Sequence, residues 1–413
     1  MKIRKILGIM GPGLITGASD DDPSGIATYS QAGAQFGLST LWTALFTFPL
    51  MAAIQGMCAR IGLVTSQGLT VTLKQHYSKP LLYIMLLFSF PAITLNIGAD
   101  IQGMGAVANM IFPAIPVSIF CVGFTSILMF VIIIYPYQKI AMILKWLCLS
   151  LLLYMIVPFM VKQDWGLIAK NTFIPTIQFN KDFISILVAI LGTTISPYLF
   201  FWQATMEAEN IAHSPQRVIV NKRVLNNMKT DVNIGMLLSN VVMFFIILTA
   251  GSVLFPSGIR QIDTVDQAAK ALEPLTGKFT YLIFALGVLG TGLLAIPVLA
   301  GSQSYMLAET FGWEAGLDKK FPQAKAFYVA IIISLLVGLS LDFLGVSPIK
   351  ALLYTAISYG LTAPVLIAVI LHIGNNKKIM GTNTNSKLSN LLGFITLVLM
   401  TVAAITLIYF LFT

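Results

Sequence analysis

Residues 19–25, Ser-Asp-Asp-Asp-Pro-Ser-Gly, interrupt an apolar stretch that runs from about residue 8 to residue 36. A charge inside a membrane helix costs roughly 2.5 to 3.5 kcal/mol on insertion scales, so three adjacent carboxylates need water, a cation or a polar partner. Pro23 lacks a backbone donor and disfavours helix at Asp22, and Gly25 lets the chain turn. The segment therefore predicts a membrane helix that is broken in its middle. The alternative is an external loop, but the residues before it are too few to cross a bilayer.

The composition of the whole chain is typical of a polytopic membrane protein. Of its 413 residues, 57% are apolar and 10% are charged, whereas about a quarter are charged in soluble domains. A bilayer crossing takes about 20 apolar residues. Eleven stretches qualify, at roughly 8–36, 38–63, 80–112, 117–136, 138–161, 183–206, 232–255, 279–308, 326–345, 349–373 and 389–412. We therefore expect an all-α integral membrane protein with eleven transmembrane helices, forming a single domain over residues 1–413.

Segments one to five and six to ten follow the same pattern. Each block opens with a long apolar stretch that is interrupted in its middle, at residues 17–25 and at residues 192–197. Because five is odd, the second block enters the membrane from the opposite face, which is typical of inverted-repeat transporters with a binding site between two discontinuous helices. The predicted repeats cover residues 1–162 and 183–373, with an additional helix at 389–412. Simple Gly and Pro kinks are the alternative.

The basic residues are distributed unequally between alternate connections. Of the 25 Lys and Arg, 17 fall on the side of the N-terminus, 7 on the other side, and Lys145 lies inside the fifth segment. This asymmetry predicts a cytoplasmic N-terminus and, after eleven spans, an external C-terminus in the inner (plasma) membrane. The formal net charge of +9 is scattered without a basic run, so we expect the bilayer as a partner and no nucleic acid. We also expect a monomer.

Two further groups of polar residues lie within predicted membrane helices. The second break, residues 192–198, offers hydroxyls and free carbonyl groups but no charge. In the third segment, Asn96 and Asp100 are four residues apart and share one helix face. A membrane carboxylate is by default a candidate for a substrate pathway or a proton relay; a structural hydrogen-bond anchor is an equal alternative. No metalloprotease, nucleophile-elbow, P-loop or dinucleotide motif occurs, so we expect a transporter without a cofactor and not an enzyme.

Taken together, these residues resemble the natural resistance-associated macrophage protein (NRAMP) family of divalent metal transporters over essentially the whole chain. Asp22-Pro23, with Ala27 and residues 31–37 after it, is similar to the family's first-helix motif, Asp-Pro-Gly-Asn and its continuation. Residues 272–275, and the stretch from Gly287 through Ala300-Gly301 to Gly312-Trp313, resemble its seventh loop and eighth helix. Residues 192–197 stand where the family has its Met-Pro-His motif in a broken sixth helix.

The resemblance implies a LeuT-like arrangement of five plus five helices, with metal bound between helices one and six. Asp22 matches the family's metal-binding aspartate, and Asp100 falls where the family has an acid used in proton transfer. The chain departs from the pattern at the asparagine ligand, which is Gly25, and at the methionine ligand, which is Ser196. Tyr198 and Gln203 replace residues that are commonly histidines in the family. We therefore expect Asp100 to act as a relay if transport is coupled to protons, and as a polar anchor if it is not.

The loss of the thioether favours a hard cation, because hydroxyl and carboxylate oxygens prefer Mg²⁺, Ca²⁺ or Mn²⁺. We predict a secondary transporter for divalent metal ions, with Mg²⁺ ahead of Mn²⁺, in which Asp22 binds the ion directly and Asp20 and Asp21 face an outer vestibule or hold water. The alternative is a permease of the same fold for an amino acid or another small organic solute. The predicted binding residues are Asp22, Ser19, Gly25, Thr193, Ser196 and Asp21. The predicted proton or polar pathway comprises Asp100, Asn96, Tyr198 and Gln203.

Overall fold

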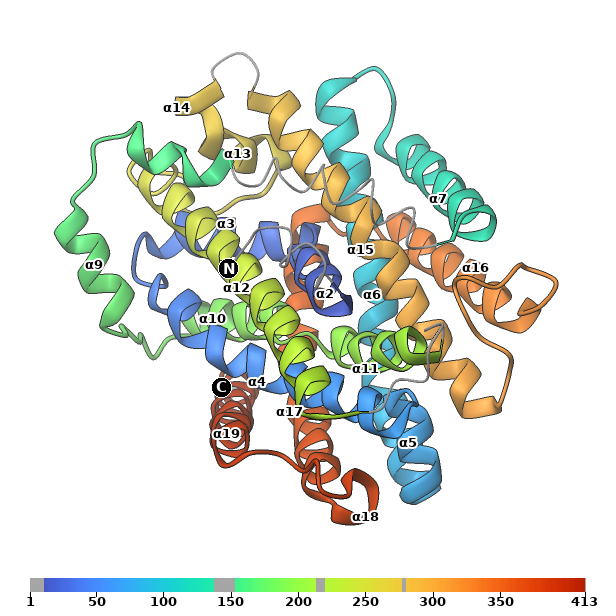
Figure 1. Ribbon diagram of the computed structural model, residues 1–413. Helices are drawn as coiled ribbons and strands as arrows, with labels where there is room; N and C mark the ends of the chain where they lie inside the picture. Colours follow the sequence, from blue (N-terminus) through green and yellow to red (C-terminus); the bar gives the residue numbers. More distant parts are fainter. Residues whose placement is uncertain (1–10, 137–152, 213–219, 277–279, 413) are drawn as a thin grey trace.

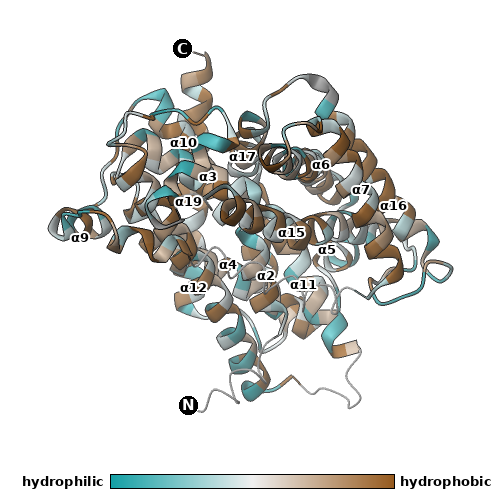
Figure 2. Cartoon of the chain, turned by 90° about the horizontal axis from the view of Figure 1, so that it is seen from above, coloured by the Kyte–Doolittle hydropathy of each residue, from teal (hydrophilic) through white to brown (hydrophobic). Residues whose placement is uncertain are grey.

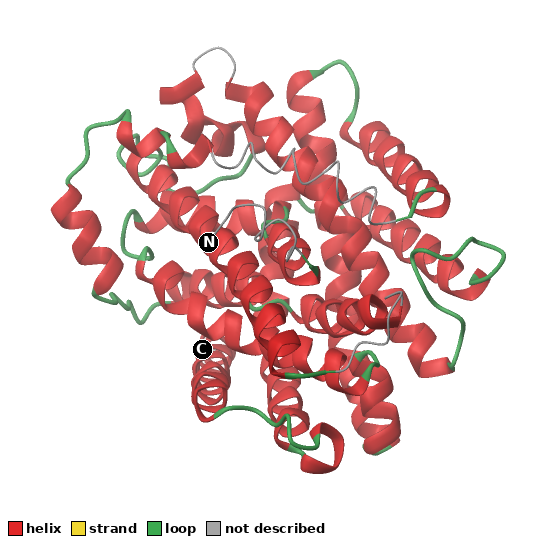
Figure 3. Ribbon diagram, in the orientation of Figure 1, coloured by secondary structure: helices red, strands yellow, loops and turns green. Residues whose placement is uncertain are grey.

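The computed structural model of the protein describes residues 11–136, 153–212, 220–276 and 280–412, and these residues contain helices and no strand (Figure 3). The first apolar stretch forms two short helices instead of one. The helices of the first half are α2 (Pro12–Asp20), α3 (Pro23–Phe36), α4 (Trp42–Thr65), α5 (Leu69–His76), α6 (Lys79–Ile111), α7 (Val117–Ile134), η2 (Val157–Phe159) and α9 (Trp165–Phe173).

The second half also begins with two helices separated by a short break. Its helices are α10 (Lys181–Thr194), α11 (Pro197–Ala212), α12 (Lys222–Val253), α13 (Val265–Ala269), η3 (Lys270–Leu272), α14 (Glu273–Thr276), α15 (Thr280–Phe311), α16 (Lys325–Ser340), η5 (Leu341–Leu344), α17 (Pro348–Asn375), α18 (Lys377–Met380) and α19 (Lys387–Phe412).

The predicted membrane segments correspond closely to these helices. In the described residues, eight helical stretches are long and apolar enough to cross a membrane, with α10 and α11 counted together, and α16 is a shorter apolar helix. Both predicted breaks are confirmed, at residues 21–22 and 195–196. Most of the predicted fifth segment, 138–161, lies outside the described residues. The division into repeats over 1–162 and 183–373 stays a prediction.

One predicted boundary is wrong by ten residues. The seventh segment was expected to begin at residue 232, but α12 begins at Lys222. The Asn221 side chain caps its first turn by accepting from the backbone N–H groups of Arg223 at 2.9 Å and Val224 at 3.1 Å. Residues 222–231 are too polar to count as a membrane segment, yet the cap and the long helix beyond them keep them helical.

Helix α12 runs unbroken along both halves of the first helix, past α2 and α3 (Figure 1). Glycines make this approach very close. A Cβ atom added at Gly17 would lie 2.3 Å from the carbonyl oxygen of Gly235 on α12, and one added at Gly33 would lie 2.4 Å from that of Ile247. Such backbone-to-backbone contact is how membrane helices associate through small residues. Helix α12 therefore holds the two halves in line across their break.

The outer helices expose apolar side chains, as expected for a lipid-facing surface. Ile119 and Phe130 of α7 are about 60% exposed, and Ile405 of α19 is 61% exposed. Seen from above, α7 and α16 are predominantly hydrophobic and lie at the edge of the bundle (Figure 2). Exposed apolar side chains gain nothing from water, so the bilayer is the natural solvent of these faces.

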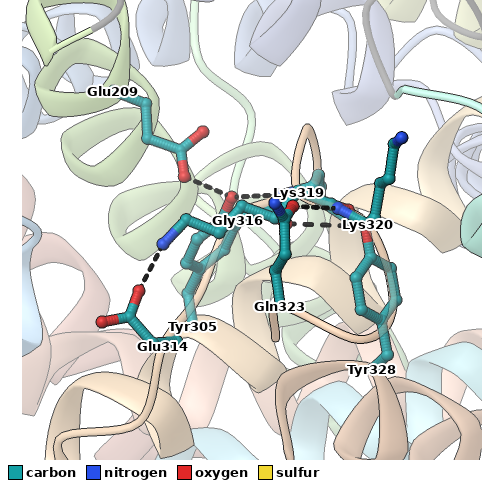
Figure 4. A network of polar contacts seen from close by, with 9 residues as sticks. Glu209, Tyr305, Glu314, Gly316, Lys319, Lys320, Gln323 and Tyr328 are labelled. Atoms are coloured by element: carbon teal, nitrogen blue, oxygen red, sulfur yellow. Dashed lines mark hydrogen bonds and ion pairs between the residues drawn. The ribbon is translucent and has the colours of Figure 1, made fainter. Parts of the chain in front are cut away.

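The connection between α15 and α16 is tied to the end of α11 by polar contacts (Figure 4). Tyr305 of α15 donates its hydroxyl to Glu209 of α11 at 2.5 Å and accepts from the backbone N–H of Leu317 at 3.0 Å. Lys319 pairs with Glu314 in the same connection and lowers the pKa of that exposed carboxyl. These contacts fix the end of α11 relative to α15 and to the connection that leads into α16.

Candidate functional site

Asp22 lies at the first break and accepts hydrogen bonds from two directions. It is the N-cap residue of α3, with extended backbone angles, and its Oδ1 accepts from the backbone N–H of Gly25 at 2.7 Å. Its Oδ2 accepts from Nδ2 of Asn96 on α6 at 2.9 Å. A helix N-terminus favours a negative charge at this position. The carboxylate is therefore held in a fixed orientation, and only 2% of the residue is exposed.

The two breaks lie against each other. Tyr198, in the first turn of α11, donates its hydroxyl to the carbonyl oxygen of Ser19 at 2.8 Å. A Cβ atom added at Gly25 would lie 3.3 Å from Oγ1 of Thr193, which is tighter than ordinary van der Waals contact. Glycine at this position thus lets the start of α3 approach the end of α10. Two segments that are far apart in the sequence meet here, as the inverted-repeat prediction required.

The oxygen atoms predicted as ligands are bonded within the protein in this conformation. The Ser196 hydroxyl donates to the carbonyl oxygens of Thr193 and Gly192, and the Ser19 carbonyl oxygen accepts from Tyr198. Ser19, Thr193 and Ser196 are all buried. The structure therefore brings Ser19, Gly25, Thr193 and Ser196 into one buried region, in which a bound cation would exchange with these internal hydrogen bonds.

Asp20 and Asp21 face away from Asn96, toward α12. The hydroxyl of Ser239 donates to Oδ2 of Asp20 at 2.7 Å and lies 3.3 Å from Oδ1 of Asp21. The two residues are 1% and 5% exposed, so in this conformation they are not in an open vestibule. Ser239 was not predicted from the sequence, because nothing distinguishes it from the other hydroxyl residues of membrane helices. Only the packing of α12 against the break identifies it.

Asp100 follows Asn96 by one turn of α6 and is fully buried. Within the described residues neither of its carboxylate oxygens has a hydrogen-bond partner. A buried carboxylate without a donor needs a proton, a cation or a water molecule to offset its charge. The two residues thus lie on one helix face, as predicted. Asn96 donates to Asp22, whereas Asp100 has no hydrogen-bond donor among the described residues.

Gln203 lies two turns along α11 from the second break. Its hydrogen bonds go to Thr16 and Glu207 and not to Asp22. Its Oε1 accepts from the Thr16 hydroxyl at 2.6 Å, and its Nε2 donates to Glu207 at 3.0 Å. The start of α2 is held as well, because Asp231 of α12 accepts from the backbone N–H of Gly13 at 2.7 Å. Sequence reasoning missed Glu207 and Asp231 because each lies one residue outside a predicted membrane segment, 183–206 and 232–255 respectively.

The donor set at the breaks is one of hard oxygens. Across the described residues, no group of three or more His, Cys, Asp or Glu side chains is arranged to hold a metal ion. A cation here would rely on the Asp22 carboxylate together with hydroxyl and backbone carbonyl oxygens. Such a set suits Mg²⁺ or Mn²⁺ with part of the water shell retained. A sulfur lies next to the second break, because Sδ of Met243 on α12 accepts from the Thr194 hydroxyl at 3.7 Å.

Comparison with known proteins places the chain among metal transporters. The profile of the family described as natural resistance-associated macrophage protein-like matches residues 13–410. The divalent metal cation transporter MntH of Clostridium acetobutylicum is 24% identical over 415 residues, covering 100% of this chain and 93% of the relative. The MntH protein of Caldanaerobacter subterraneus subsp. tengcongensis is 23% identical, covering 95% and 90%.

Solved structures support the same fold. The manganese transporter of Eremococcus coleocola superposes with a TM-score of 0.78 at 16% identity, covering 98% of this chain and 87% of that one. Mhp1, a nucleobase-cation-symport-1 family transporter, superposes with a TM-score of 0.59 at 13% identity, covering 96% and 91%. The likeness to both confirms the LeuT-like arrangement with two discontinuous helices.

Proposed function

The chain belongs to the natural resistance-associated macrophage protein family, and from this membership we propose that it carries divalent metal cations across a membrane, binding them between the broken helices α2/α3 and α10/α11. The family is one of transporters, and the chain is a multi-pass membrane protein and not an enzyme. The curated relatives are named divalent metal cation transporters. The observation that carries the proposal is the Asp22 carboxylate at the first helix break, held by the backbone N–H of Gly25 and by the Asn96 side chain of α6.

We assign the direct ligand role to Asp22, with oxygens of Ser19, Thr193 and Ser196 completing the site. Ser196 stands where the family has a methionine, and its hydroxyl supports a preference for a hard ion, with Mg²⁺ ahead of Mn²⁺. The proposal is strengthened by the closeness of these oxygens in a buried region. Mg²⁺ gives up water reluctantly, so the site would open enough to admit a partly hydrated ion.

Release toward the inner side would require α2 to move. Four polar contacts tie this nine-residue helix to its neighbours: Tyr198 to the Ser19 carbonyl, Thr16 to Gln203, the Gly13 N–H to Asp231, and the Ser239 hydroxyl to Asp20. In the proposed cycle these bonds break when the inward path opens and form again when it closes. Asp100 lies one turn of α6 from Asn96, which binds Asp22, and its carboxylate oxygens have no hydrogen-bond partner in the described residues. We assign proton transfer to Asp100, if transport is coupled to protons.

The proposed orientation in the plasma membrane has the N-terminus in the cytoplasm. The positive-inside rule supports it, because Lys and Arg gather in the connections on that side. The proposed direction of transport is inward, and the proposed unit of function is a monomer.

The function is tested by uptake into proteoliposomes that contain the purified protein. Mg²⁺, Mn²⁺ and Ca²⁺ are supplied in one set of assays and a panel of amino acids in another, with protein-free vesicles as the control. We expect saturable uptake of at least one divalent cation. Uptake of an amino acid in the absence of ion flux would instead favour the same-fold permease.

The choice of metal is tested by Ser196→Met, which restores a thioether at the second break. We expect the variant to gain Cd²⁺ transport relative to Mg²⁺, because sulfur prefers softer ions. Competition by Cd²⁺ against Mn²⁺ uptake measures the shift, and Ser185→Met, at a position of α10 remote from the break, is the matched control. An unchanged selectivity in Ser196→Met would argue that this side chain does not contact the ion.

A further inference from the structure

A cavity of about 220 Å³ lies between α4, α12 and the start of α19, apart from the two helix breaks. Its lining changes character along its length. Charged groups lie near the N-terminus of α12, and the lining deeper along α4 is apolar, while the start of α19 contributes both serines and leucines. The polar lining consists of Arg60, Lys229, Asn233, Ser386 and Ser389, and the apolar lining includes Phe48, Pro49, Ala52, Ala53, Leu388 and Leu392.

The polar end carries two positive charges that no acid neutralises. Arg60 donates to Oδ1 of Asn385 at 3.2 Å and lies 3.5 Å from the carbonyl oxygen of Thr384, both neutral acceptors. Neither Arg60 nor Lys229 has an ion-pair partner in the part of the chain that the structure describes. The segments outside that part contain no Asp or Glu. The cavity therefore attracts an anion and lacks one of its own.

The apolar end is an open channel along α4. Arg60 and Phe48 are twelve residues apart on this helix, which corresponds to about 18 Å. One leaflet of the hydrocarbon core is about 15 Å thick, so the cavity spans a similar depth. At Gly56, which lies between them, an added Cβ would meet no atom within 4 Å. A free inorganic phosphate has no apolar part, so it would occupy only the polar end of the cavity and leave the apolar end unfilled.

We propose that this cavity binds an anionic phospholipid, with the phosphodiester against Arg60 and Lys229 and an acyl chain along the face of α4 that includes Gly56. Charge-assisted hydrogen bonds from a guanidinium and an ammonium match phosphate oxygens. Basic pockets between membrane helices recognise anionic headgroups in the same way. The hydroxyls of Ser386 and Ser389 share a hydrogen bond at 3.0 Å, which leaves one hydroxyl proton free to donate at the headgroup level. The bound lipid would join α19, which lies outside the predicted repeats, to α4 and α12.

The test measures the thermal unfolding midpoint of the delipidated protein in detergent as lipid is added. Dioleoylphosphatidylglycerol, dioleoylphosphatidylcholine and inorganic phosphate are the three probes. Four variants are compared with the wild type: the double variant Arg60→Gln with Lys229→Gln, Gly56→Leu to fill the channel, Gly123→Leu as the control for an equally open glycine on α7, and Lys222→Gln with Arg223→Gln as the control for charge elsewhere on α12.

We expect phosphatidylglycerol to raise the midpoint of the wild type and of both controls. The concentration needed should increase on the order of thirtyfold in the Arg60/Lys229 double variant, from the loss of two charges near the headgroup, and the effect should vanish in Gly56→Leu. Equal stabilisation by phosphatidylcholine, or full replacement by inorganic phosphate, would overturn the proposal. An equal loss in the Lys222/Arg223 variant would also overturn it, because attraction would then come from general surface charge. If Gly56→Leu does not fold, the charge variants decide.

Discussion

At the scale of single residues, the candidate site depends on how Asp22 is oriented. The residue serves as helix cap and as charged group at once: the α3 N-terminus stabilises its charge, and Asn96 fixes its second oxygen. Asp22 could be singled out from the sequence, since an acid directly before a proline in an apolar stretch combines a helix break with a charge that needs a partner. Asn96 was predicted only as part of a polar pathway, because the helix that would face a given side chain cannot be read from one sequence.

Replacing Asn96 by alanine removes one of the two donors to Asp22. An unpaired buried polar group costs about 1–3 kcal/mol. We expect the substitution to destabilise, by this amount, the orientation in which the Asp22 carboxylate binds the cation. Initial-rate measurements of Mn²⁺ uptake should therefore show a raised KM, by on the order of tenfold, with the protein still folded. Asn109→Ala, on the exposed end of the same helix, is the control and should behave as wild type. A KM in Asn96→Ala equal to that of Asn109→Ala would contradict the positioning role.

At the scale of elements, the broken first helix is stabilised by an unbroken neighbour. Helix α12 packs against α2 through Gly13, Gly17 and Gly235, and Ser239 bonds the carboxylates at the break. The break itself was predictable, because the carboxylates and Pro23 disfavour continuous helix. The predicted turn at Gly25 is wrong, because α3 already begins at Pro23 and Gly25 lies inside it. The partner helix was not predictable, because apolar periodicity says that a helix is buried but does not say against what. Hydropathy also failed to predict the polar start of α12, because a helix cap and not an apolar sequence makes these residues helical.

The close contact of glycines between α2 and α12 predicts that any larger side chain at Gly17 lowers the stability of the protein. A methyl group there would meet the Gly235 backbone at 2.3 Å, so Gly17→Ala should destabilise the protein by roughly 1–3 kcal/mol through overpacking. The thermal unfolding midpoint in detergent measures this. Gly123→Ala is the matched control, because its Cβ meets no atom within 4 Å and alanine is favoured over glycine in helices. Equal midpoints for the two variants would contradict the close packing.

At the scale of the whole molecule, the all-helical membrane fold was largely predictable, and the division into repeats stays a prediction. Eleven apolar stretches, two with central interruptions in corresponding positions, indicate the inverted-repeat architecture before any contact is known. Side-chain placement around the site was less accessible. Asp20, Asp21 and Asp22 are adjacent in the sequence, yet two face α12 and one faces α6, because the helix is interrupted between them and its regular succession of faces is lost.

The orientation of the molecule in the membrane is open to a direct test. Single cysteines are introduced at Asn171, in the connection after segment five, and at Thr382, between segments ten and eleven. A membrane-impermeant maleimide should label position 171 in intact cells and position 382 only after permeabilisation, because the positive-inside rule places the N-terminus in the cytoplasm. The protein without an added cysteine is the control, and two of its own cysteines, Cys58 and Cys121, are buried. The reverse labelling pattern would invert the proposed topology.

The central claim is that a divalent cation binds at Asp22, and the most direct test is metal flux through Asp22→Asn in proteoliposomes. Asparagine is as good a helix N-cap as aspartate, so the variant keeps the cap of α3 and loses only the negative charge. Asp164→Asn is the matched control, because Asp164 caps α9 in the same way but is exposed. We predict that Mg²⁺ and Mn²⁺ uptake falls to the level of protein-free vesicles in Asp22→Asn and is retained in Asp164→Asn. Undiminished uptake by a folded Asp22→Asn protein would contradict the claim.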